Sequence, residues 1–367
     1  MRDRVLVLNA GSSTLKASVL APGLEHVEAS LTVPMQGAGD AADALGLALQ
    51  AIVAAGVDLS SVRAAGHRVV HGGPLFTRTT LIDDTVLRRI RELAWLAPLH
   101  NPVAAEVIAA ALRALPGVPH AAAFDSAFHA ALPKEAYLYA LPYEWYSEWG
   151  YRRYGFHGLS VAWSVERTAR LLGRDDLGVV VAHLGAGCSV SAVWQGRSVS
   201  TSMGMTPLEG LVMATRAGSV DPGVLLAAQR DHGLDVRALE EVLEHRSGLL
   251  GLSGRTADMR ELLALAATDD RAALTIAMFE RSAAAAIAAA ATALPRLDAI
   301  VFTGGIGEHA ASVRASIVQR LASIGVRPID EASVDGDRVL SAHHVSVLVI
   351  VAREDVVIAR ELSALTT

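Results

Sequence analysis

The sequence holds a single cysteine, Cys188, which excludes a disulfide within the chain and fits a reducing cytoplasm. Lysine is almost absent, because 30 of the 32 basic residues are arginine and only Lys16 and Lys134 are lysine. The formal net charge is −6 and there is no long basic run, so we expect no nucleic-acid surface. The most apolar stretch, residues 282–295, is a short alanine tract. It is well below the ~20 strongly apolar residues that cross a bilayer, so we expect no membrane contact.

The sequence does hold enough apolar material for a large core. Apolar residues make up 52% of the 367 positions and charged residues 19%, and this length predicts about two domains. Two similar segments stand some 175 residues apart. In each, a short apolar run (5–8, 179–182), a Gly-rich turn (9–13, 183–187) and an alternating run (15–20, 189–194) follow one another. The repeat predicts a chain of two similar halves.

Helical periodicity appears at residues 40–56, 101–115, 158–172 and 270–294, and residues 299–302 form another short apolar run. Strands that alternate with such helices predict an α/β fold in which helices cover mixed sheets. Lys134 follows Pro133, and we expect it to be a solvated residue at the start of a helix.

Three Gly-rich segments, NAGSSTLK, HLGAGCS and FTGGIGEH, each follow an apolar strand and are expected to be turns. Successive backbone N–H groups in such turns form concave anion sites, so the three together favour phosphate binding. None is a Walker A loop or a G-x-G-x-x-G fingerprint. Residues 13–16 match the S-x-x-K of penicillin-recognising enzymes, but no K-T-G element follows, and this excludes that hydrolase reading.

Histidine is plentiful, with 13 residues, so metal binding has to be considered. His67 and His71 are separated by a strand-like segment of roughly 13 Å, too far for both rings to bind one zinc. Histidines and arginines in apolar or Gly-rich surroundings are expected to bind anions, since a buried guanidinium needs a negative partner. These residues are Arg68, His100, His157, His183 and Arg216.

Nine motifs in order resemble the acetate kinase family, within the acetate and sugar kinase, Hsc70 and actin superfamily. They are VLVLNAGSSTLK, GHRVVHGG, LAPLHNP, FDSAFH, RRYGFHG, HLGAGCS, SMGMTPLEGLVMATRAG, FTGGIGEH and EDVVIAR, between residues 5 and 360. The resemblance implies two actin-like (ribonuclease H-like) domains of mixed sheet covered by helices, with the active site in the cleft between them. We expect residues 1–130 and 356–367 to form the N-terminal domain, and residues 131–355 the nucleotide-binding C-terminal domain.

The resemblance also implies a role for each matching residue. The catalytic set is Asp125, Arg68, His157 and Arg216. The substrate pocket is formed by Arg68, Val70, Leu99, His100, Phe156 and Pro207. The nucleotide and its phosphates meet Ser12, Ser13, Lys16, His183, Leu184, Gly185, Ala186, Gly187, Asp258, Met259, Arg260, Gly305, Ile306, Gly307, Glu308 and His309. Asn9 and Glu354 help place Mg²⁺, or Mn²⁺ instead, and Asp125 is expected to position metal-bound water and Arg216 rather than to take a proton.

The resemblance thus implies reversible, direct in-line transfer of the ATP γ-phosphoryl group to acetate, giving acetyl phosphate and ADP, by a cytoplasmic homodimer. A propionate or butyrate kinase is the alternative, because one methylene in an apolar pocket discriminates by only ~1–3 kcal/mol. A non-catalytic nucleotide-binding member is disfavoured, since every charged site residue is present. Ala186, Cys188 and His309 depart from the family's usual asparagine, serine and asparagine, and Ala186 and His309 therefore bear on nucleotide preference.

Overall fold

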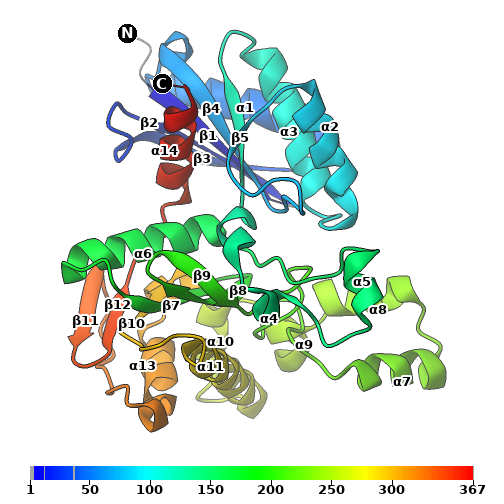
Figure 1. Cartoon of the computed structure of the whole chain (residues 1–367), viewed down its shortest axis with the longest axis vertical. Helices are drawn as coiled ribbons and strands as arrows, with labels where there is room; N and C mark the ends of the chain where they lie inside the picture. The colour runs from blue at the N-terminus through cyan, green and yellow to red at the C-terminus, as the bar shows by residue number, and fades with distance from the viewer. Residues whose placement is uncertain (1–3, 12, 36–37, 367) are drawn as a thin grey trace. The chain divides into compact units, whose positions relative to one another are not determined.

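The computed structural model describes residues 4–11, 13–35 and 38–366, which form two compact units (Figure 1). The first comprises Met1–Ala130 and Arg353–Thr367, and the second Ala131–Ala352. The sequence-based division placed the second boundary at residues 355/356 instead. The difference matters for one residue, because Glu354 lies in the first unit, together with Asn9.

A six-stranded mixed sheet forms the centre of the first unit, in the order β3-β2-β1-β4-β6-β5. Its strands are β1 (Arg4–Ala10), β2 (Thr14–Leu20), β3 (Val27–Pro34), β4 (Val62–Val69), β5 (Thr80–Leu81) and β6 (His120–Phe124). β1, β4 and β6 run parallel, whereas β2, β3 and β5 pair antiparallel with their neighbours. The parallel strands are buried almost throughout, as strands covered on both faces are.

Helices cover both faces of this sheet. α1 (Ala41–Ala54) and α3 (Asn101–Ala114) pack with one face, where Ala65 of β4 belongs to the apolar core. α2 (Asp84–Glu92) packs on α3. α14 (Glu354–Thr366) packs on the other face through Gly66, where an added Cβ would lie 2.4 Å from Cγ2 of Ile358. The absence of a side chain at Gly66 therefore lets α14 approach the sheet closely.

The second unit repeats this topology strand for strand. Its sheet has the order β11-β12-β10-β7-β8-β9. The strands are β7 (Gly178–Leu184), β8 (Cys188–Trp194), β9 (Arg197–Thr201), β10 (Ala299–Thr303), β11 (Arg338–Ala342) and β12 (Ser346–Val349). β7, β10 and β12 are parallel, and the outer strands are antiparallel, as in the first unit. The duplication predicted from the repeated hairpin is confirmed.

The helices of the second unit are α4 (Lys134–Tyr137), α5 (Tyr143–Ser147), α6 (Gly158–Leu172), α7 (Pro222–His232), α8 (Val236–His245), α9 (Gly248–Ser253), α10 (Met259–Leu265), α11 (Asp270–Ala291), α12 (Gly304–His309) and α13 (Ala311–Arg320). α11 alone among the described helices is long and apolar enough to cross a membrane. It packs on β7, β8, α9, α10 and α13 and buries Ile276, Phe279 and Ile287. α11 is therefore a core helix of this unit.

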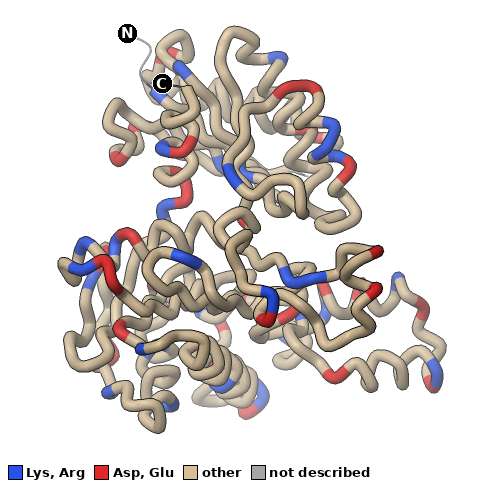
Figure 2. The backbone as a smooth tube through the Cα atoms, viewed as in Figure 1, with Lys and Arg blue, Asp and Glu red and all other residues tan. Residues whose placement is uncertain are grey.

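The predicted helices and hairpins occur where the periodicity placed them, and α6 begins and ends at the predicted residues. Lys134 is exposed at the first position of α4, as expected. The third Gly-rich segment is not a turn but the helix α12, which Thr303 precedes in an extended conformation. On the surface, acidic and basic residues are interspersed, as on α2 where Arg89 pairs with Glu92 (Figure 2).

Candidate functional site

Four polar side chains of the first unit meet at the carboxyl ends of its parallel strands. Asn9 near the end of β1 lies opposite Arg68 of β4, Asp125 directly follows β6, and Glu354 begins α14. We call these residues the Arg68 cluster. Parallel strands end at the same sheet edge, and α14 begins beside that edge. Asn9 and Glu354, which are 345 positions apart in sequence, therefore lie close together.

Arg68 forms hydrogen bonds with Asp125 and Asn9 and an ion pair with Glu354. Its Nε donates to Oδ1 of Asp125 at 2.9 Å, and its Nη2 pairs with Oδ2 of the same carboxylate. Nη1 donates to Oδ1 of Asn9 at 3.1 Å, and Nε lies 3.6 Å from Oε2 of Glu354. The side chain of Asp125 is only 1% exposed. This is a bidentate, largely desolvated pair, in which both position and charge of the guanidinium are fixed.

The electrostatics of the cluster favour a cation. Burial alone would lower the pKa of the Arg68 guanidinium, but the carboxylates of Asp125 and Glu354 outweigh it and raise that pKa. Two carboxylates against one guanidinium leave an excess of negative charge and several oxygen ligands, counting the amide oxygen of Asn9. Hard cations such as Mg²⁺ prefer oxygen ligands of this kind.

The β1–β2 hairpin provides the candidate phosphate contacts of the first unit. Lys16 lies opposite Asn9 in the β1–β2 register and its side chain is exposed, as is Ser13. Both are therefore open to a ligand from solvent. Ser12 lies outside the described residues.

The predicted substrate-pocket residues come from both units. Val70 is buried just after β4, Leu99 is 37% exposed, and His100 precedes α3 in the first unit. Phe156 is 1% exposed and Pro207 is buried, both in the second unit.

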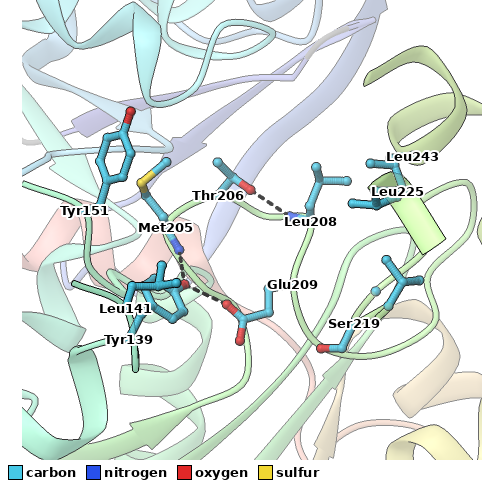
Figure 3. Close-up of a pocket in the computed structure, with 12 residues that line it drawn as sticks. Tyr139, Leu141, Tyr151, Met205, Thr206, Leu208, Glu209, Ser219, Leu225 and Leu243 are labelled. Atoms are coloured by element: carbon cyan, nitrogen blue, oxygen red, sulfur yellow. Dashed lines mark hydrogen bonds between the residues drawn. The ribbon is translucent and has the colours of Figure 1, made fainter. Parts of the chain in front are cut away.

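The loop that carries Pro207 is anchored by residues that sequence reasoning missed. The hydroxyl of Tyr139 donates to Oε2 of Glu209 at 2.6 Å and accepts the backbone N–H of Met205 at 2.9 Å (Figure 3). Arg153 pairs with the other oxygen of Glu209. Burial and Glu209 raise the pKa of Tyr139, so its hydroxyl stays protonated and keeps donating. A cavity of about 520 Å³ adjoins the loop, with Leu208 and Leu225 among its lining residues (Figure 3).

His157 stands at the N-terminus of α6 with a left-handed backbone, φ 57°. Such a conformation is uncommon outside glycine and clusters at functional sites. Nδ1 of its ring lies 3.0 Å from Oγ of Ser189, and the ring stacks on His183 with centroids 4.1 Å apart. Nδ1 of His183 in turn lies 2.9 Å from Oγ of Ser160. The imidazole of His157 is thus oriented on two sides.

Gly187 leaves room in front of two of the predicted catalytic side chains. A Cβ added there would lie 3.4 Å from Nε2 of His157 and 3.7 Å from Nη1 of Arg216. We call Gly187, His157 and Arg216 the Gly187 cradle. The space beside Gly187 is therefore bordered by one nitrogen of each side chain, which suits an anionic oxygen.

Arg216 has a carboxylate partner that no motif indicated. Its Nε donates to Oε2 of Glu244, in the last turn of α8, at 2.8 Å. The expectation from sequence named only Asp125 as an acidic residue that positions Arg216. In the structure Asp125 pairs with Arg68, and Glu244 pairs with Arg216. Only a contact between segments distant in sequence could have revealed Glu244.

A cavity of about 610 Å³ in the second unit brings together half of the residues predicted to meet the nucleotide and its phosphates. Its lining includes Gly185, Ala186, Asp258, Met259, Arg260, Gly305, Ile306 and His309. Ala214, Ala257, Leu263 and Ala310 complete the lining and were not foreseen. Small and apolar side chains dominate the lining, as in sites for a flat organic group.

Burial and hydrogen bonds hold in place the elements that carry the predicted nucleotide residues. Leu184 and Gly307 are buried. Oε1 of Glu308 accepts the backbone N–H groups of Gly304 at 2.9 Å and Ala352 at 3.0 Å, which stabilises the start of α12. Asp258 accepts the backbone N–H of Arg260 as the N-cap of α10, and the Arg260 side chain lowers the pKa of Asp258 to about 2.

The turn of residues 185–187 connects the cavity with the cradle. Gly185 and Ala186 line the cavity, and the next residue is Gly187. Cys188 then begins β8, and burial raises the pKa of its thiol to about 12, so it is an inert core residue.

Known proteins resemble this chain over nearly its whole length. The model of the acetokinase family matches residues 25–360. The chain is 44% identical over 389 residues to an acetate kinase of Deinococcus radiodurans, covering 98% of this chain and 97% of that protein. Among solved structures, it resembles an acetate kinase of Porphyromonas gingivalis with a TM-score of 0.91, 31% identity and full coverage of both chains.

A propionate kinase of Francisella tularensis has the same TM-score of 0.91, with 36% identity over 99% of both chains. These full-length matches confirm the duplicated actin-like fold expected from the sequence. By its family model and its relatives, the chain belongs to the acetokinase family.

Proposed function

We propose that this chain transfers the γ-phosphoryl group of ATP to acetate, reversibly and directly, giving acetyl phosphate and ADP. The observation that carries the proposal is the continuity of the 185–187 turn. It lines a cavity fit for a nucleotide and ends at Gly187, beside which an anionic oxygen would face Arg216 and His157.

The chemistry asks for charge stabilisation more than for proton transfer. Acetate is already ionised at neutral pH, so its attack on phosphorus needs no strong general base. The barrier lies in bringing two anions together and in the charge that spreads over the equatorial oxygens. Arg68 would hold the carboxylate, and Arg216 and His157 the transferring group. Asp125 then acts by positioning Arg68, with which it makes a bidentate pair.

The Arg68 cluster fits Mg²⁺. Among the residues that the structure describes, no group of three or more His, Cys, Asp or Glu side chains forms a metal site. Mg²⁺ characteristically takes only one or two carboxylates from a protein and completes its shell with water and phosphates. Asn9, Glu354 and, through water, Asp125 would hold it. When bound, the ion would neutralise charge on the nucleotide phosphates.

Acetate is the proposed acceptor, and propionate is the alternative. The similarity to a propionate kinase structure favours keeping that alternative. A coupled assay of purified protein with Mg-ATP should give a higher kcat/KM for acetate than for propionate or butyrate. Higher efficiency with propionate or butyrate would preserve the mechanism and change the acceptor. No turnover with any of the three would refute the proposal.

Nucleotide choice is tested in the same assay. Ala186 and His309 are exposed on the wall of the cavity, where they face any bound base. We expect Ala186→Asn and His309→Asn to change the ratio of kcat/KM between ATP and GTP. Equal ratios in all three proteins would contradict a role in base recognition.

We also propose a cytoplasmic homodimer. The single buried cysteine supports a reducing compartment. α7 and α8 bury none of their side chains, and Val224, Leu226 and Val236 are 59%, 62% and 71% exposed. Exposed apolar groups of this kind are common at protein contacts. Light scattering during gel filtration should give twice the mass of one chain, and a monomer would contradict the proposal.

A further inference from the structure

We infer that Glu244 is a positioning residue for phosphoryl transfer, acting through Arg216. It holds the guanidinium so that Nη1 faces the Gly187 cradle. The inference rests on the function proposed above and assigns a role to a residue outside every motif.

The geometry fixes both ends of the interaction. Nε of Arg216 donates to Oε2 of Glu244 at 2.8 Å, and the two side chains are only 19% and 14% exposed. A guanidinium is a rigid planar fork, so fixing Nε also fixes the directions of both Nη groups. One of these, Nη1, lies 3.7 Å from the Cβ position of Gly187. Glu244 thus occupies one edge of the fork, while Nη1 faces the cradle.

The backbone around Glu244 belongs to the same assembly. Oγ1 of Thr215 donates to the carbonyl of Glu244 at 2.7 Å. The backbone N–H of Ala217 donates to the carbonyl of Leu243, and that of Ser247 to the carbonyl of Thr215. The loop bearing Arg216 is therefore bonded to the end of α8 on both sides of residue 216. These bonds do not use the Glu244 side chain, so they survive its truncation.

Core packing does not explain why a glutamate side chain lies beside Arg216. α8 has no fully buried residue, so its packing does not require a carboxylate at position 244. Attraction of anions does not explain it either, because a carboxylate beside Arg216 offsets its charge and repels phosphate. What remains is orientation: the carboxylate reduces the attraction for the substrate but holds the donors in place. Correct placement of a catalytic donor is worth up to ~10²-fold in rate.

Loss of orientation and loss of the negative charge should change different measured quantities. Loss of orientation lowers kcat, whereas loss of the charge strengthens nucleotide binding. Glu244→Ala removes both the hydrogen bond and the negative charge, whereas Glu244→Gln removes the charge and keeps an acceptor for Nε. Glu241→Ala, on an exposed position of α8, is the matched control. We would measure kcat with ATP and acetate, the dissociation constant of a fluorescent ATP analogue, and the melting temperature of each protein.

We expect Glu244→Ala to lower kcat at least tenfold while the dissociation constant stays equal or falls. Glu244→Gln should keep kcat within about threefold of the wild type, and Glu241→Ala should have the same kcat as the wild type. Normal kcat in Glu244→Ala would overturn the inference. So would a rise in the dissociation constant or a loss of thermal stability in proportion to kcat, because Glu244 would then only maintain the loop. A wild-type protein without activity would instead refute the proposed function, and with it the inference.

Discussion

The pair of Arg68 and Asp125 allows a quantitative test of the first unit's active-site cluster. We consider Arg68→Met, which keeps much of the side chain's length but removes its charge and all five donors. The substitution leaves Asp125 without its bidentate partner, and that carboxylate is 1% exposed. Leaving one member of a buried ion pair uncompensated typically costs 3–5 kcal/mol, so we expect a loss of about 4 kcal/mol in the free energy of unfolding at pH 7.

This loss in the free energy of unfolding should come from the uncompensated charge of Asp125 rather than from lost packing of the Arg68 side chain. The double variant Arg68→Met/Asp125→Asn, which removes the buried charge of Asp125 and leaves only the partly exposed carboxylate of Glu354, should recover at least half of the lost stability.

Urea unfolding followed by circular dichroism at pH 7 measures these free energies. Arg68→Lys serves as a control that keeps the charge but not the fork. All variants should lose acetate-dependent activity, so activity does not separate them. A double variant as unstable as Arg68→Met would refute the reasoning.

Three further predictions follow from single positions. Gly66→Ala should lower the free energy of unfolding by about 1–3 kcal/mol through a clash with Ile358, and Ile358→Ala should restore part of it in urea unfolding. Gly187→Ala should lower kcat on the order of 10²-fold at an unchanged melting temperature, because its methyl group fills the cradle; normal kcat would argue against anion binding there. Burial lowers the pKa values of His67 and His120 below 6.5, so the unfolded state binds more protons and stability should fall as pH drops below about 6.5. Urea titrations between pH 7 and 5 check this, and an equal slope in His67→Phe would contradict it.

The sequence predicted the four longest described helices and the two hairpins, but not the amphipathic helices α2 and α8. The ends of α6 follow from a regular apolar face that stops at Gly173, whose φ of 67° suits glycine. Elements with weak patterns were missed. β3 and β9 are edge strands, and β5 has only two residues. Their sequences therefore show little of the apolar pattern that burial produces. Helix α12 was mistaken for a turn because glycine disfavours helices in isolation, whereas tertiary contacts stabilise this one.

The site was predictable only where its residues share a segment. The turn of residues 185–187 carries its own signal, since glycine and position after a strand are both visible in the sequence. Asn9 and Glu354 are 345 residues apart, and only the family resemblance connected them. Glu244 carried no signal of either kind. Its importance arises from a contact with Arg216 that depends on how α8 ends, and Tyr139 meets Glu209 in the same way, through folding alone.

The return of the chain from the second unit to α14 has a consequence for biosynthesis. α14 covers one face of the first unit's sheet, yet it follows about 220 residues of the second unit in the chain. At a synthesis rate of about 5–20 residues per second, that delay is roughly 10–45 s. Throughout it, the nascent first unit exposes the sheet face around Gly66, and Glu354 has not yet been made. The first unit is therefore the one that needs protection on the ribosome, although it is synthesised first.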